Sequence, residues 1–306
     1  MLAPVDFPPF RLAIGSTGSA EFPLALPVLA GDATERLFPH AEGAGRHGAF
    51  ALFRQDTWLI GLAMRPVDGD IERATAALYG DLMTAARGRY LARIWNYVPA
   101  INASGPGGLE NYRAFCRGRS LAFEREFGLD FSRYAPAASG VGCEGDRLAI
   151  MFAACHARPQ HIENPRQVPA YDYPPQYGPR PPTFARATIV PRPGGRTIFV
   201  SGTSAIRGHA TVAPDDTLGQ LRCTLDNLYE VGRACGFDPD SNGASAVVRH
   251  VRVYLRRAAD QPAVAALLES EWLGGPDRVA YLRSDVCRHE LNVEIEATIE
   301  DGAITP

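Results

Sequence analysis

The sequence predicts an α+β protein built from two related halves, and three observations support this fold class. Short apolar strands come in hairpins before the amphipathic helices, which is typical of a mixed α+β arrangement rather than a doubly wound parallel sheet. The order of hairpin, helix, strand, helix and strand occurs twice along the 306 residues. The motif DRLA at Asp146 also has a counterpart, DRVA, at Asp277, which agrees with an internal duplication.

Each element follows from local periodicity. In the first half, the pattern predicts a hairpin over residues 49–55 and 57–64, a helix over 70–89, a strand over 90–99, a second helix over 108–128 and a strand over 146–156. In the second half, it predicts a hairpin over residues 195–203 and 209–213, a helix over 216–236, a strand over 245–257, a short helix over 262–274, and closing strands over 277–286 and 289–299.

The helix over residues 216–236 has the clearest signals. Asp216 can cap its start, and Gly236 follows its end. Apolar residues recur at helical spacing at Leu218, Leu221, Leu225, Leu228 and Val231.

These patterns divide the chain into a first half over residues 1–160, a proline-rich loop within residues 161–190, and a second half over residues 191–306. Because the loop joins the halves, we expect a pocket between them.

Composition narrows the function. The chain is 46% hydrophobic and 21% charged with a net charge of −3, which offers no general attraction to nucleic acid or membranes. No basic segment followed by an apolar run opens the chain, and no apolar run approaches the length of a membrane span, so we expect a cytoplasmic protein. Homo-oligomerisation is left open.

All 31 basic residues are arginine. The absence of lysine excludes a phosphate-loop lysine, a pyridoxal Schiff base and a lysine general base. The six cysteines form no CxxC pair and have no histidine at metal-ligand spacing, so no metal is predicted. His209 and His289 are interpreted as structural.

Two segments combine arginines with aromatic residues as an anion-binding pocket would. Residues 93–119 form the first, and the proline-rich loop of residues 164–186 forms the second. Seven prolines restrict that loop, so its side chains have little entropy left to lose on binding. We predict that the two segments are walls of one site.

The closing strand supplies a candidate acid. Alternation places Leu291, Val293 and Ile295 on one face, and Asn292, Glu294 and Glu296 on the other. If the second face lines a pocket, burial would raise the pKa of a glutamate and keep a proton available near neutral pH. Alternation does not distinguish Glu294 from Glu296.

Residues 199–206, 216–237 and the VEIEA strand resemble the YjgF/Rid fold. Three longer motifs, IWNYVPAIN with GLENYRAFCRGR, the proline-rich loop, and CRHELNVEIEA, resemble the chorismatase and 3-hydroxybenzoate synthase family over about residues 50 to 300. The resemblance implies two YjgF/Rid-like halves, each a mixed sheet packed by helices, chorismate as substrate, and no metal or organic cofactor.

Motif by motif, the resemblance implies that Tyr112, Arg119, Tyr173 and Arg186 bind substrate and that Glu294 is the catalytic acid. Arginine suits this substrate, because chorismate carries two carboxylates that planar guanidinium groups can bind in a bidentate manner. The sequence departs from the expected pattern at Ser204, where a smaller residue is expected.

Cys287, next to this strand, bears on the product. In the resembled family a cysteine here accompanies an aromatic product, which implies 3-hydroxybenzoate, with 4-hydroxybenzoate as a side product left open. The alternatives are hydrolysis of chorismate to a dihydroxycyclohexadienoate, and a Rid-like imine deaminase or metabolite-binding protein that would use Arg278.

Overall fold

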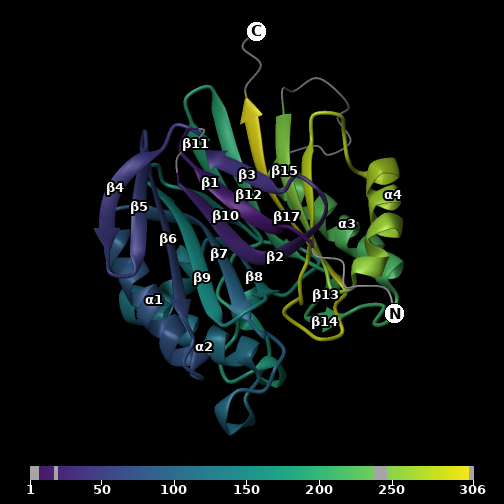
Figure 1. The fold of residues 1–306 in the computed structure, drawn as a ribbon, viewed down its shortest axis with the longest axis horizontal. Helices are drawn as coiled ribbons and strands as arrows, with labels where there is room; N and C mark the ends of the chain where they lie inside the picture. The colour runs from purple at the N-terminus through teal and green to yellow at the C-terminus, as the bar shows by residue number, and fades with distance from the viewer. Residues whose placement is uncertain (1–6, 17–19, 237–246, 303–306) are drawn as a thin grey trace.

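The computed structural model describes residues 7–16, 20–236 and 247–302. Two sheets lie face to face, and a pair of helices covers the outer face of each (Figure 1). This arrangement confirms the predicted α+β class. None of the helices in the described ranges has the length and apolar character that a bilayer span requires. Ser245 and Ala246, where a strand was predicted to begin, lie outside the described residues.

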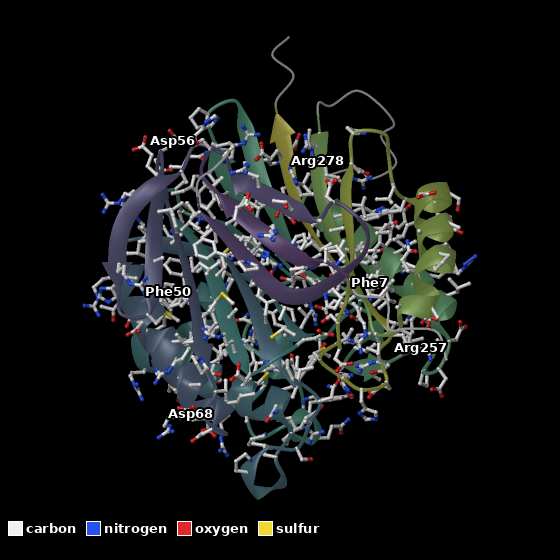
Figure 2. The ribbon with its side chains drawn as sticks, in the orientation of Figure 1. Phe7, Phe50, Asp56, Asp68, Arg257 and Arg278 are labelled. Carbon is white, nitrogen blue, oxygen red and sulfur yellow. The ribbon has the colours of Figure 1, made fainter. Side chains whose placement is uncertain are left out.

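The first-half elements form a six-stranded sheet with strand order β4 (Glu42–His47), β5 (Phe50–Gln55), β6 (Trp58–Pro66), β9 (Arg147–Cys155), β7 (Tyr90–Pro99) and β8 (Ala137–Cys143). Its outer face packs on α1 (Ile71–Ala85) and α2 (Asn111–Phe127). Phe50, labelled in Figure 2, meets Phe152 edge-on in this layer at a centroid distance of 5.3 Å. The Asp70 carboxylate accepts from the Arg73 amide and so caps α1.

The second sheet has nine strands in the order β10 (Gln160–Ile162), β11 (Ala187–Arg192), β12 (Gly195–Thr203), β17 (Val293–Gly302), β15 (Val247–Leu255), β16 (Arg278–Arg283), β2 (Glu21–Gly31), β1 (Pro9–Ile14) and β3 (Thr34–Phe38). Helices α3 (Thr217–Ala234) and α4 (Gln261–Glu271) cover its outer face. Strands β1, β2 and β3, where the sequence predicted no element, join this sheet because β2 pairs with β16. The boundaries at residues 160 and 190 stay a prediction.

One predicted hairpin was wrong. Residues 195–203 do form β12, but its hairpin partner is β11, not residues 209–213. Pro193 and Gly194 form the turn between β11 and β12, and both Gly194 and the first residue of β12, Gly195, have positive φ, which favours a tight reversal. Residues 210–211 instead form β14 (Ala210–Thr211), which pairs with β13 (Ile206–Arg207).

The predictions for α3 are confirmed. Asp216 accepts from the Gly219 amide at the first turn, and Gly236 has a φ of 65° just beyond the end. Leu221, Leu225, Leu228 and Val231 are buried against the nine-stranded sheet, whereas Leu218 is 39% exposed.

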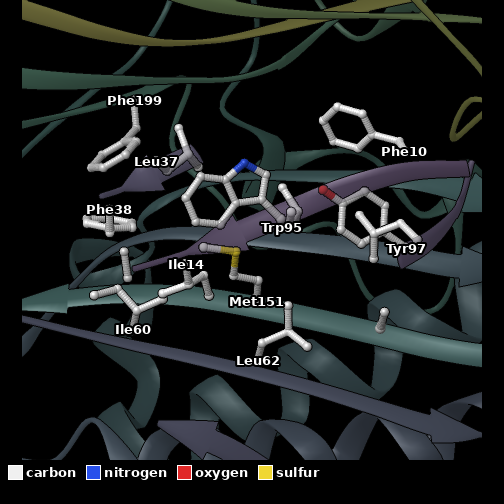
Figure 3. Close-up of a cluster of buried hydrophobic side chains, with 14 of the residues drawn as sticks. Phe10, Ile14, Leu37, Phe38, Ile60, Leu62, Trp95, Tyr97, Met151 and Phe199 are labelled. Carbon is white, nitrogen blue, oxygen red and sulfur yellow. The ribbon is translucent and has the colours of Figure 1, made fainter. Parts of the chain in front are cut away.

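An apolar core holds the two sheets together. Trp95 of β7 lies at its centre and meets Phe199 of β12 edge-on at 5.9 Å, with Met151 and Phe10 nearby (Figure 3). Such buried aromatic rings supply much of the apolar area that stabilises the sandwich. Because Arg93 precedes Trp95 by two positions on the same face of β7, the core continues into a buried polar region.

Candidate active site

The two faces of β17 have different surroundings. Val293 and Ile295 pack into the apolar cluster beneath α3 and α4, as the alternation predicts. Glu294 and Glu296 therefore point toward the six-stranded sheet, and both are almost fully buried. The contacts of the two carboxylates separate their roles.

Glu296 belongs to a buried ion network. Its carboxylate accepts from Arg93 at 2.7 Å and from Arg252 at 2.9 Å. Arg252 also pairs with Glu35 of β3 at 2.6 Å and donates to the Tyr97 hydroxyl at 2.7 Å. Both oxygens of this carboxylate are therefore taken up by ion pairs inside the protein, and neither faces the Glu294 cavity.

Glu294 instead faces a cavity. Its Oε2 accepts from the Ser204 hydroxyl at 3.3 Å, and among the described residues no arginine forms an ion pair with it. The other oxygen lies against Gly202, where a Cβ atom would come within 2.0 Å of Oε1. Only glycine at position 202 leaves room for the carboxylate in this position.

This environment favours the protonated form of Glu294. Burial raises the pKa of its carboxyl group to about 8, and the negative charge of Glu296 adds to the increase. The Ser204 hydrogen bond and the charges of Arg93 and Arg186 act in the opposite direction. At neutral pH most molecules therefore carry a proton here, which a general acid requires.

The cavity has a volume of about 170 Å³ and brings together the two segments that the sequence singled out. Tyr112 and Arg113 reach it from the first turn of α2, and Tyr173, Tyr177 and Arg186 reach it from the proline-rich loop. Cys287 and Glu294 complete the wall formed by the second half. The predicted site residues Tyr112, Tyr173, Arg186, Cys287 and Glu294 thus line one cavity.

Arg186 is buried and held rigidly. Its Nη2 donates to the Tyr173 hydroxyl at 2.9 Å and to the Val168 carbonyl at 3.0 Å, and the guanidinium lies 5.0 Å from the centre of the Phe184 ring. Its Nε makes no hydrogen bond and lies 3.9 Å from a carboxylate oxygen of Glu163, with which it forms an ion pair. These contacts preorganise the guanidinium at the wall of the cavity that it lines.

Arg119 does not line this cavity. It follows Tyr112 by seven residues, or about 10 Å along α2. Its guanidinium is 2% exposed and lies 5.1 Å from the centre of the Phe115 ring, in the layer between α2 and its sheet. The substrate contact predicted for Arg119 stays a prediction.

Arg288 is a further arginine of the cavity, and it was not among the predicted site residues. Its guanidinium lies 3.9 Å from the centre of the Tyr177 ring, Nη1 donates to Thr211 Oγ1 at 3.1 Å, and Nη2 is buried without a partner. The sequence signal was present, because Arg288 directly follows Cys287 in the CRHE motif. Arg186 and Arg288 therefore bring two positive charges to the cavity, in addition to Arg113, which pairs with Glu110 at 3.2 Å.

Cys287 is a free cysteine at the cavity wall. Burial raises the pKa of its thiol to about 12, and the charge of Glu294 adds to the increase. The side chain is therefore a neutral thiol near pH 7, and behaves as a compact apolar group rather than a thiolate nucleophile. No cluster of metal-ligating side chains lies within the parts of the chain that the structure describes.

Sequence comparison identifies the relatives of this chain. The family model described as "Chorismatase FkbO/Hyg5-like, N-terminal" matches residues 38–154. A 3-hydroxybenzoate synthase of Streptomyces hygroscopicus is 40% identical over 247 residues, which cover 76% of this chain and 71% of the relative. The chain belongs to the chorismatase family. A chorismatase of Streptomyces rapamycinicus is 39% identical over 85% of this chain and 80% of its own length.

A solved structure agrees with this assignment. A crystal structure of a chorismatase superposes with a TM-score of 0.78 and 33% identity, and covers 97% of this chain and 95% of its own. The YjgF gene product of E. coli aligns with only 45% of this chain, at a TM-score of 0.33. That similarity is too low to transfer an activity.

Proposed function

We propose that this chorismatase-family protein cleaves chorismate to pyruvate and 3-hydroxybenzoate. One observation carries the proposal: Glu294, a buried carboxyl group that favours its protonated form, lies in a cavity lined by Arg113, Arg186 and Arg288. Chorismate has two carboxylates and an acid-sensitive enol ether, which match these two features. Relatives named chorismatase support chorismate as the substrate.

In the proposed mechanism, Arg186 and Arg288 each bind one carboxylate of chorismate. Glu294 then donates its proton to the terminal carbon of the enolpyruvyl group, which becomes an oxocarbenium ion, and the ring C–O bond becomes breakable. A positioned general acid contributes roughly 10²- to 10⁴-fold in rate. The tyrosines that line the cavity orient the carboxylates through their hydroxyl groups.

The product depends on what replaces the departing pyruvate. We propose that the neighbouring ring hydroxyl displaces pyruvate, gives an arene-oxide-like intermediate and returns its proton to the Glu294 carboxylate. Collapse of the intermediate gives 3-hydroxybenzoate, with no net water consumed. The neutral thiol of Cys287 supports this route, because a compact apolar group at the wall disfavours an attacking water molecule.

The imine-deaminase alternative would need Arg278 in the site. Arg278 is exposed at the start of β16 (Figure 2) and lines a different cavity from that of Glu294. In the sheet register, Arg278 of β16 lies opposite His250 of β15, which lies opposite Thr298 of β17. Thr298 is four residues beyond Glu294, so Arg278 lies away from the Glu294 carboxyl group along the strands. No feature of the Glu294 cavity favours imine hydrolysis.

Incubation of the purified protein with chorismate tests the proposal. Pyruvate is measured with lactate dehydrogenase, and ring products are separated and identified by mass spectrometry. We expect equimolar pyruvate and 3-hydroxybenzoate. Pyruvate together with a dihydroxycyclohexadienoate would show that the protein hydrolyses chorismate and does not form 3-hydroxybenzoate. Absence of pyruvate would refute the activity.

A further inference from the structure

A second cavity, which we name the Arg89 cavity, lies at the opposite end of α2 from the Glu294 cavity. It has a volume of about 440 Å³ and is lined by Arg89, Tyr90, Phe127, Arg133, Tyr134 and Arg158, together with Leu91, Pro159 and His161. The 17 residues of α2 separate the two cavities by about 24 Å. This volume lies within the range of about 300–1,000 Å³ that is usual for small-ligand sites.

The positive charges of this cavity have no acidic partners. Arg89, Arg133 and Arg158 form no ion pair with any described residue, and no acidic residue lines the cavity. Arg89 Nε is buried without a hydrogen-bond partner. The chain has 34 acidic residues against 31 arginines, so a shortage of acids does not explain three unpaired guanidinium groups in one hollow.

Electrostatics in this cavity favour an anion of more than one charge. The C-terminal end of α2 lies nearby and contributes about half a negative charge through its dipole. Three guanidinium groups outweigh it several-fold. Burial lowers the pKa of His161 to about 4, so its imidazole ring is neutral near pH 7 and adds no charge. A net positive hollow of this kind matches phosphate groups, which guanidinium binds in a bidentate manner.

The cavity also presents aromatic surface. Tyr90 and Tyr134 are 41% and 43% exposed, which makes them two of the four large apolar or aromatic side chains with high exposure among the described residues. Tyr134 stacks on Phe127 at a centroid distance of 4.6 Å and an interplanar angle of 8°. Phe127 thereby covers one face of the Tyr134 ring and fixes the orientation of the ring. A planar ligand ring can stack on the opposite face.

From these features we propose that the Arg89 cavity binds a small phosphorylated molecule with a planar ring, of the nucleotide class. The guanidinium groups hold the phosphates, and the Tyr134 and Tyr90 rings contact the planar group. The proposal is independent of the reaction at Glu294, because the two cavities share no lining residue.

Isothermal titration calorimetry with adenosine diphosphate tests it on the full chain. We expect one saturable site at moderate salt, with weaker binding of inorganic phosphate alone and of adenosine alone. The double variant Arg133→Gln/Arg158→Gln should weaken adenosine diphosphate binding at least about tenfold, because two phosphate ligands are lost. Pyruvate release from chorismate should be unchanged in this variant.

The matched control is Arg54→Gln/Arg65→Gln, which removes two exposed charges that lie outside both cavities. This control should keep wild-type affinity. Equal weakening in both double variants would show only general electrostatic attraction and would overturn the proposal. So would absence of saturable binding, or phosphate binding as tightly as adenosine diphosphate.

Discussion

The substitution Glu296→Gln should change the pH dependence of the enzyme without touching the reacting groups. The two carboxylates of β17 lie two positions apart on one face, or about 6.6 Å along the strand. At an effective dielectric constant of about 20, two unit charges at that separation interact by about 2.5 kcal/mol. This energy corresponds to about 1.8 pKa units.

Loss of the Glu296 charge therefore lowers the pKa of Glu294, and the uncompensated charges of Arg93 and Arg252 act in the same direction. Because a general acid works only when protonated, wild-type activity should fall as pH rises through about 8. In the variant this fall should occur about one to two pH units lower. At pH 7 the variant should be up to about tenfold slower, while at pH 5 the two should be similar.

The assay is the pH profile of kcat for pyruvate release from chorismate, with circular dichroism to verify the fold of the variant. Ser204→Ala is the companion test, because removal of a hydrogen bond to the carboxylate should move the same midpoint upward. Ser204 stands in a short segment after β12, so this variant is available even where Glu296→Gln fails to fold. An unchanged midpoint in both folded proteins would refute the proposed control of Glu294.

Three further predictions follow from the cavity. Arg186→Ala and Arg288→Ala should each weaken binding of a non-reactive chorismate analogue by roughly 2–5 kcal/mol in calorimetry, with only partial rescue by lysine; unchanged affinity in both would sink the two-carboxylate model. In ¹⁸O-labelled water, wild-type 3-hydroxybenzoate should carry no label, whereas Cys287→Ala should form some labelled dihydroxycyclohexadienoate; an unchanged product profile would make the cysteine simple core filler. The free energy of unfolding should fall as pH rises from about 4.5 to about 8, because folded Glu294 retains a proton that the unfolded chain releases. Urea titrations at both ends of this range should show that Glu294→Gln lacks this component. Equal pH slopes for the wild type and the variant would count against a raised pKa of Glu294.

Local sequence patterns predicted those parts of the fold that depend on neighbouring residues. Asp216, the leucines of α3 and Gly236 specify a helix with its ends, because caps and periodicity act within a few positions. The pairing of β2 with β16 joins segments about 250 residues apart, and no local signal specifies such a partner. The partner of β12 was missed although it is local, because the turn residues Pro193 and Gly194 were not recognised as a hairpin turn.

The site was predicted in the same uneven way. Alternation put Glu294 and Glu296 on one face, but only the arrival of Arg93 and Arg252 from other strands distinguishes a paired carboxylate from an unpaired one. The helix motif put Tyr112 in the first turn of α2, where its side chain lines the cavity, and its contact with substrate stays a prediction. The motif could not show that the proline-rich loop meets that first turn, and so it could not separate Arg119 from Arg288 as a cavity cation.

The most direct test of the account compares pyruvate release from chorismate by the wild-type protein and by Glu294→Gln. The substitution keeps the volume of the side chain and its contact with Ser204, but removes the proton donor. We predict measurable turnover by the wild type and at least about 10²-fold slower turnover by the variant, with normal folding. Pyruvate release by Glu294→Gln at a rate near that of the wild type would contradict the central claim that Glu294 is the acid.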